Sequence, residues 1–268
     1  MKENNISKLN SDATGMQQIS KNKDLKITLV FTLVGLIAGF FTGLYQASIA
    51  TEELKQQILS QLGSMELMMV IAAAQGAVYA CLSSFIGLKL ARKVNLKLNF
   101  KFDKNAMILA TIIGMVTAII ITGSDKFIFA EYLPPQVTSY VFSPTYLMVG
   151  IIYGGIVEEL LLRLLVMSVL VLVLWKLFAK SKDKQAIPNW IYITAIVVAS
   201  TLFAAGHLPI TEQTIGLSVP IIIRCFALNG IGGIGFGYLY WKKGLAYSMF
   251  SHAATHVFMQ VILMPILF

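Results

Sequence analysis

The sequence predicts an all-α protein, a polytopic transmembrane bundle of about seven helices, with eight as the alternative count. Of the 268 residues, 57% are hydrophobic and 13% are charged, whereas about 25% of the residues in an average soluble domain are charged. Apolar runs of roughly 20 residues recur along the chain, and each is long enough to cross a hydrocarbon core of about 30 Å. We therefore expect one transmembrane domain over residues 27–268.

The apolar runs indicate where the spans lie. The first run follows a polar segment, residues 1–26, which we expect to be a disordered cytoplasmic tail. The run is longer than the apolar core of a signal peptide, so we interpret it as a retained helix; processing at the cleavage-like Ser48-Ile49-Ala50 is the alternative. The predicted spans are 27–50, 67–91, 106–130, 145–177, 190–208, 219–240 and 245–267.

The fourth run leaves the number of spans open. As a helix, its roughly 33 residues would extend about 50 Å, well beyond one bilayer crossing. It must therefore project into the cytoplasm, kink, or split into two spans.

Basic residues alternate between the connections and predict the orientation. Lysine and arginine cluster before span one and after spans two, four and six, while the other connections hold mainly Asp and Glu. Because basic loops stay on the cytoplasmic side, the amino terminus is expected inside and the carboxyl terminus outside. The basic residues of the cytoplasmic connections thus account for the net charge of +8. We expect a multi-pass cell-membrane protein that lies in the lipid bilayer and has no nucleic-acid partner.

Three ionisable side chains interrupt the fourth run, Glu158, Glu159 and Arg163. Each costs about 2.5–3.5 kcal/mol at the centre of a membrane helix, so such residues tend to carry function. Glu159 and Arg163 are four residues apart and can form an ion pair on one helix face. Glu158 is turned about 100° away, which leaves it free to act as a general base or to bind a metal. A structural triad or an element of an ion pathway is the alternative interpretation.

All three histidines follow these carboxylates, within predicted spans or at their ends. His252 and His256 are four residues apart, so both imidazoles project from one helix face and can reach one metal or one substrate. A hydrogen-bonded pair between helices is the alternative. His207 ends the run Phe203-Ala204-Ala205-Gly206-His207, whose small residues leave room for a neighbouring helix.

The sixth run is rich in glycine. Its Gly233-xxx-Gly237 spacing predicts a face of small residues that lets helices approach closely. Arg224 and Asn229 in the same run are weaker site candidates, because each can instead neutralise a carboxylate or satisfy a backbone group.

Together these motifs are similar to those of the CPBP family, which contains the type II CAAX prenyl proteases and the bacterial Abi-like membrane proteases. The resemblance covers a protease core at about residues 145–260. The motifs follow one another on successive late helices as Glu158-Glu159-xxx-Arg163, Phe203-xxx-His207 and His252-xxx-His256.

The resemblance implies an intramembrane endopeptidase acting on a membrane-embedded or lipidated peptide or protein. It implies that Glu158 and His207 activate the attacking water, and that His252 with residue 256 polarises the scissile carbonyl. His256 departs from the family, which more often has asparagine there. Neutral histidine can still donate a hydrogen bond to an oxyanion, so a metal-free mechanism survives.

A metalloprotease is equally compatible with these residues. One carboxylate and three imidazoles, from Glu158, His207, His252 and His256, form a plausible shell for zinc or another divalent metal. The sequence leaves the choice between zinc and a metal-free route open.

Two alternatives to a protease remain. One is a non-catalytic membrane scaffold, regulator or bacteriocin self-immunity protein of the same fold. The other is a transporter with a proton relay, although the sequence shows no obvious internal repeat that would support it. One conflict also stands against the protease. In the predicted spans His207 lies near the outer end of its helix and His252 nearer the inner side, so their meeting requires tilted helices or shifted boundaries.

Overall fold

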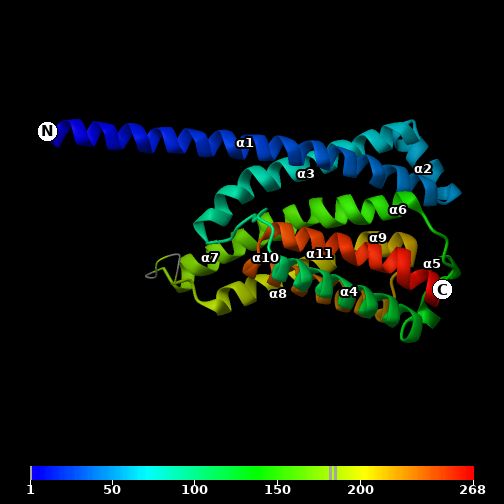
Figure 1. The fold of residues 1–268 in the computed structure, drawn as a ribbon. Coiled ribbons are helices and arrows are strands. Elements are labelled where there is room, and N and C mark those ends of the chain that lie inside the picture. The colour runs from blue at the N-terminus through cyan, green and yellow to red at the C-terminus, as the bar shows by residue number, and fades with distance from the viewer. Residues whose placement is uncertain (1, 181–182, 184–185) are drawn as a thin grey trace.

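The computed structural model describes residues 2–180, 183 and 186–268, with side chains described from Asn22 onward except Gln136. Helices run side by side along one common direction (Figure 1). In this described part, seven are long and apolar enough to cross a membrane, which confirms the predicted count. They are Asn22–Ile49, Met65–Lys93, Lys104–Phe127, Pro144–Phe178, Asn189–Thr214, Val219–Lys242 and Leu245–Leu267.

The first half of the chain forms α1 (Lys2–Ile49), α2 (Glu52–Leu62), α3 (Met65–Lys93) and α4 (Lys104–Phe127). Local capping defines the short α2. Thr51 Oγ1 accepts the Leu54 N–H at 3.3 Å where α2 begins, and Gly63 ends it at φ 82°, a conformation that suits glycine. The predicted tail, residues 1–26, falls mostly where side chains are not described, and its disorder stays a prediction.

Glycines bring α1 and α3 into close contact. A Cβ added to Gly35 would lie 2.6 Å from Ala80 Cβ, and one added to Gly39 would lie 2.8 Å from the Ala73 Cα. Side chains larger than hydrogen therefore do not fit between these backbones. Lipid gives apolar helices little reason to associate, so van der Waals contact of this kind is what holds such a pair together.

The long fourth run is one continuous helical span, so the alternative of eight spans is wrong. It comprises α6 (Pro144–Met148), the π-helical segments η2 (Val149–Glu158) and η3 (Leu160–Met167), and α7 (Ser168–Phe178). Glu158 and Glu159 lie where η2 meets η3. The wider turns of π-helical segments are frequent at functional sites.

The remaining elements include the last three spans. Two lie close together: a Cβ added to Gly233 would lie 2.8 Å from Ser200 Cβ, and one added to Gly237 would lie 3.0 Å from Ile196 Cγ2. This confirms the predicted small-residue face, here between α8 and α10. The elements are η1 (Ala130–Tyr132), α5 (Pro135–Thr138), α8 (Asn189–Gly206), α9 (Leu208–Thr214), α10 (Val219–Lys242), α11 (Leu245–Val257), η5 (Phe258–Leu263) and α12 (Met264–Leu267).

Backbone hydrogen bonds fix the start of α11. The Leu245 N–H donates to the Lys97 carbonyl and the Ala246 N–H to the Leu98 carbonyl, each at 2.9 Å. These bonds satisfy donors that the first turn of a helix leaves open. The connection between α3 and α4 therefore holds in place the helix that carries two of the three histidines.

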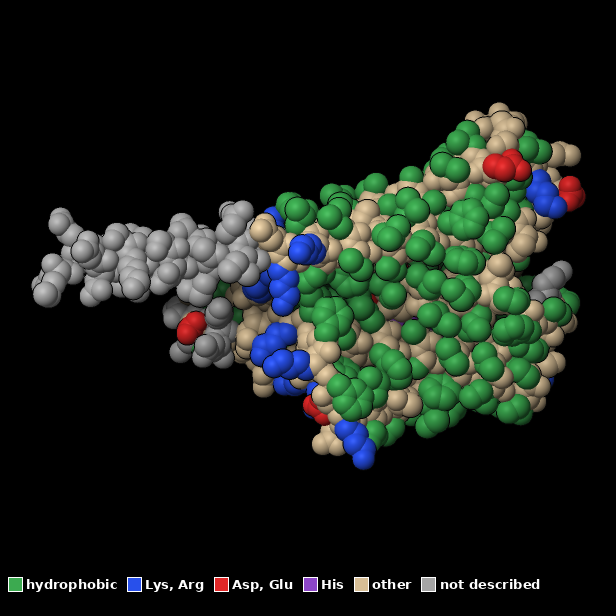
Figure 2. Space-filling model, turned by 45° about the horizontal axis from the view of Figure 1, so that its top comes forward, with side chains coloured by type: hydrophobic (Ala, Val, Ile, Leu, Met, Phe, Trp, Pro, Cys, Tyr) green, Lys and Arg blue, Asp and Glu red, His purple; other side chains and the backbone are tan. Residues whose placement is uncertain are grey.

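The surface of the bundle is apolar along its length, while lysine and arginine gather at one end (Figure 2). We call this end the basic end; the opposite, or far, end carries α2 and the connection from α4 to α6. The apolar surface agrees with a multi-pass membrane protein. Which end faces the cytoplasm stays a prediction. The residues that define the basic end are Lys93, Lys97, Lys101, Lys104, Lys176, Lys180, Lys242 and Lys243.

Candidate active site

Glu158 faces two imidazoles that come from different helices. Its Oε1 lies 4.0 Å from His207 Nε2, and its Oε2 lies 3.8 Å from His252 Nε2. The side chains of Glu158 and His207 are 20% and 29% exposed, whereas that of His252 is 6% exposed. The η2, α8 and α11 elements thus converge on one half-open group of titratable side chains.

Glu159, the next residue, is fully buried, and its carboxylate contacts three other side chains. Its Oε1 lies 3.3 Å from Arg163 Nη1 and 2.9 Å from His252 Nδ1, and its Oε2 accepts a hydrogen bond from the Ser248 hydroxyl. The predicted ion pair between Glu159 and Arg163 is therefore present. Arg163 also donates from Nη2 to the Gly233 carbonyl at 3.1 Å. Because the buried charges are paired and hydrogen-bonded, this cluster can persist inside the bundle.

The partners of two imidazoles determine which nitrogen carries a proton. His207 Nδ1 lies 2.9 Å from the Phe203 carbonyl, an oxygen that can only accept, so Nδ1 is the donor. His252 Nδ1 faces the Glu159 carboxylate in the same way. In each neutral ring the Nε2 lone pair is then directed toward Glu158, where it can accept a proton.

Aromatic rings hold these imidazoles in place. Phe236 stacks on His252 with centroids 4.5 Å apart, and Phe203 packs edge-on against His207 at 4.6 Å. The Arg163 guanidinium carbon lies 5.0 Å from the Phe203 centroid and 5.6 Å from that of Phe236. Phe203 thus packs in the core, as an aromatic at that spacing usually does, and also contacts the site.

His256 occupies space that two glycines of η2 leave open. Its ring lies parallel to that of His252, with centroids 5.4 Å apart. A Cβ on Gly150 would lie 2.6 Å from His256 Nδ1, and a Cβ on Gly154 would lie 3.1 Å from His256 Nε2 and 3.3 Å from His252 Nε2. Both Nε2 atoms are therefore directed to the same small volume beside Gly154.

The conflict in depth between His207 and His252 comes from a wrong boundary. The fifth span continues through α9 to Thr214 instead of ending at residue 208, so His207 lies inside the span. Leu208 and Pro209 follow it without breaking the apolar segment. Although α8 ends at Gly206, α9 follows it directly, so the predicted boundary at residue 208 lies six residues short of the end of the span.

Sequence reasoning missed two residues of the site, Ser248 and Phe236. Ser248 is fully buried and lies four residues before His252 on the same helix face, so the spacing of α11 was a usable signal. Phe236 lies among the glycines of α10, where nothing in the spacing distinguishes it from core.

The two weaker candidates have structural partners. Arg224 Nε and Nη2 each lie 2.6 Å from a carboxylate oxygen of Asp125, which joins α10 to α4 near the far end. Asn229 donates to the Cys225 carbonyl one turn earlier, at 2.9 Å. Arg224 thus neutralises a carboxylate, and Asn229 satisfies a backbone group, which are the two alternatives predicted for them.

The predicted zinc shell can be compared with the donor atoms. In the part of the chain that the structure describes, no group of three or more His, Cys, Asp or Glu side chains is arranged to hold a metal ion. We therefore derive no step of the mechanism through a metal, and zinc stays a prediction for experiment.

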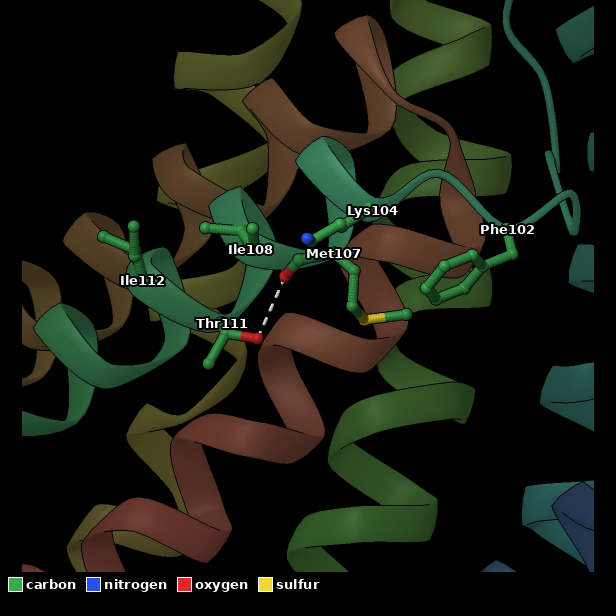
Figure 3. Close-up of a pocket in the computed structure, with 6 residues that line it drawn as sticks. All are labelled: Phe102, Lys104, Met107, Ile108, Thr111 and Ile112. Carbon is green, nitrogen blue, oxygen red and sulfur yellow. Dashed lines mark hydrogen bonds between the residues drawn. The ribbon is translucent and has the colours of Figure 1, made fainter.

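A surface pocket lies away from the site, on the outer face of α4 (Figure 3). One of its polar groups is already paired, since the Thr111 hydroxyl donates to the Met107 carbonyl at 2.9 Å. None of the six predicted site residues lines it. The lining residues are Phe102, Lys104, Met107, Ile108, Thr111 and Ile112.

The seven candidate membrane-spanning helices of the described residues define the class as a polytopic membrane protein, with a half-open carboxylate between two imidazoles beside a buried ion pair. Residues 140–258 match the family model described as Type II CAAX prenyl endopeptidase Rce1-like. The matched segment includes all six predicted site residues and confirms the resemblance. At the family level it supports an intramembrane peptidase. No curated protein and no solved structure matches the chain.

Proposed function

We propose that this protein is an intramembrane endopeptidase that hydrolyses a peptide bond with water activated by Glu158 and His207. The approach of the Glu158 carboxylate to His207 and His252 within 4.0 Å and 3.8 Å is the observation that carries this proposal. Glu158 is part-exposed, while its neighbour Glu159 is occupied by Arg163, His252 and Ser248. Only the first of the two carboxylates is thus available for proton transfer.

A water molecule between Glu158 and His207 would begin the reaction. Glu158 takes a proton from this water as the oxygen attacks the carbonyl carbon of the substrate, and the Nε2 lone pair of His207 holds the second hydrogen. The carbonyl oxygen becomes an oxyanion, which needs an N–H donor close by. His256 Nε2, directed at the volume beside Gly154, is our assignment for that donor.

Collapse of the tetrahedral intermediate breaks the C–N bond, and the leaving nitrogen must gain a proton. Glu158 holds the proton taken from water, and His252 Nε2 lies 3.8 Å from its carboxylate. His252 is thus positioned to pass this proton to the leaving amine. The resemblance implies a role in polarising the carbonyl instead, but in the neutral ring the bond from Nδ1 to Glu159 leaves Nε2 as an acceptor.

The substrate class follows from where the site lies. Its groups lie within the spans, so the scissile bond must reach them from lipid or from one membrane surface. A membrane-embedded or lipidated peptide meets this requirement. We propose the cytoplasmic side for the basic end and for the amino terminus, in accord with the distribution of basic residues.

Glu158→Gln tests this function in purified protein reconstituted into vesicles with a library of membrane peptides. It keeps the size of the side chain and removes the base, so cleavage should fall by about 10²–10⁴-fold, the usual contribution of a general base. Glu53→Gln, on the exposed α2, is the matched control and should leave cleavage unchanged. A parallel series with a zinc chelator decides whether a metal takes part.

Equal cleavage by wild type and Glu158→Gln would reject the proposal. A well-folded wild-type protein that cleaves none of the peptides, yet whose cellular effect survives Glu158→Gln, would instead support a non-catalytic scaffold or immunity role.

A further inference from the structure

We propose that Gln260 is a positioning residue that sets the tautomer of His256 and so makes its Nε2 the donor to the oxyanion. This inference rests on the proposed function, because it concerns the same reaction. It assigns a role to a side chain outside the three sequence motifs.

The orientation of the His256 ring is the first step. Gly150 lies beside Nδ1 and Gly154 beside Nε2. Since the fourth span runs from the far end toward the basic end, Gly154 is one turn nearer the basic end than Gly150. Nε2 is therefore directed toward His252, and Nδ1 toward the far end.

Gln260 lies one turn beyond His256 in that same direction, because α11 continues toward the far end through η5. Its side chain is 2% exposed. Its amide nitrogen is buried without a hydrogen-bond partner among the described residues, and so is His256 Nδ1. One group is a donor and the other can be an acceptor, and they follow each other on one helix face.

Pairing these two groups is energetically favoured. A buried donor left unsatisfied is costly, and neither atom is paired with the other or with any described residue, so the amide N–H gains by reaching Nδ1 through one bridging water molecule. The backbone around Gln260 is also held in place, because the Tyr140 hydroxyl donates to the Gln260 carbonyl at 2.6 Å. This bond joins the connection at the far end to the π-helical turn that carries the glutamine.

The chemical consequence concerns the other nitrogen of the ring. If Nδ1 accepts the hydrogen bond that the water molecule relays from Gln260, the single proton of the neutral imidazole resides on Nε2, facing the volume beside Gly154. With the opposite tautomer, an Nε2 lone pair would face the oxyanion and repel it. His207 and His252 have Nδ1 as donor, so His256 would be the one histidine with the reverse tautomer.

Two substitutions separate this role from simple packing. Gln260→Met keeps the volume and removes the amide, and Gln260→Glu keeps the shape but presents acceptor oxygens to Nδ1. We expect both to lower kcat by about 10-fold or more with KM little changed, within the 10²–10³-fold value of one oxyanion donor. Gln57→Glu, on the exposed α2, is the matched control.

His256→Asn supplies the decisive background, because an asparagine amide donates without a tautomer to be set. In that background the Gln260 substitutions should no longer change kcat. Equal losses in both backgrounds would show that Gln260 acts through packing and would overturn the proposal.

A spectroscopic measurement keeps the proposal testable even if no peptide is cleaved. In protein with ¹⁵N-labelled histidine, the His256 ring should give the shift pattern of Nε2–H in the wild type and of Nδ1–H, or of the doubly protonated ring, in Gln260→Glu. An Nδ1–H pattern in the wild type would refute the proposed tautomer, whereas Nε2–H with an inactive enzyme would refute only the proposed function.

Discussion

Glycines serve the α1–α3 pair and the contact of η2 with α11 in different ways. Between α1 and α3 the space above Gly39 is filled by backbone, with the Ala73 Cα 2.8 Å from an added Cβ. Beside Gly150 and Gly154 the space is filled by the imidazole of His256. The first arrangement holds two helices together, and the second makes room for a polar ring inside the membrane.

The comparison shows that one sequence feature can have two consequences in a membrane bundle. Small residues allow a close approach, and what approaches depends on the facing helix. Where the facing residues are alanine and glycine the result is packing, and where they are histidine the result is a site. Substitutions in the two regions should therefore separate stability from activity.

The largest effect is expected from the fully buried charges of the site region. Arg163→Met leaves the fully buried Glu159 without its cation, so the free energy of unfolding should fall by about 3–5 kcal/mol. Arg92→Met is the matched control, since in the Arg92–Asp24 pair at the basic end the arginine side chain is 49% exposed, so solvent screens the pair and it should contribute about 1 kcal/mol or less. Unfolding in mixed detergent micelles measures both, and similar losses would mean that burial does not distinguish the two pairs.

Gly150→Ala should be next in size, and it should act on activity. The added methyl must displace the His256 ring, whose Nδ1 would lie 2.6 Å away, so kcat should fall by about 10²–10³-fold as an oxyanion donor is lost. Gly123→Ala on α4, where an added Cβ meets nothing within 4 Å, is the control. Retained kcat in folded Gly150→Ala would remove His256 from the reaction.

Gly39→Ala should do the reverse. Its methyl would be forced against the α3 backbone, and overpacking of this kind costs about 1–3 kcal/mol. Peptide cleavage per folded molecule should stay at the wild-type value, since no site residue lies on α1 or α3. A drop in kcat without a loss of stability would show that the α1–α3 pair shapes the site.

The smallest effect tests how α1 is joined to the site region. Tyr45 of α1 stacks on Tyr146 of α6 with centroids 4.9 Å apart. Tyr45→Leu should lower the free energy of unfolding by about 0.5–1.5 kcal/mol more than the loss of buried apolar area alone would, because the stacked ring pair is lost. Peptide cleavage should be unchanged. Phe226→Leu, at an exposed position of α10, is the control, and an equal change in both variants would indicate lipid contact instead of stacking.

Much of the fold could be predicted because the bilayer imposes local rules. A span needs about 20 apolar residues whatever its neighbours are, so the seven runs were identified from composition alone. The ion pair of Glu159 and Arg163 was also predictable, since residues four apart meet within one helix. The end of the fifth span was not, because α9 continues the crossing after Gly206 and His207.

The sequence by itself determined the seven spans, the chemical types in the site and the pairing of Glu159 with Arg163, all of which depend on spacing along one helix. Only the tertiary structure decided that Glu158 meets His207 and His252, and that Ser248 binds Glu159. Such meetings depend on the tilt, depth and rotation of separate helices. In lipid those are set by side-chain packing between helices, which no single helix encodes.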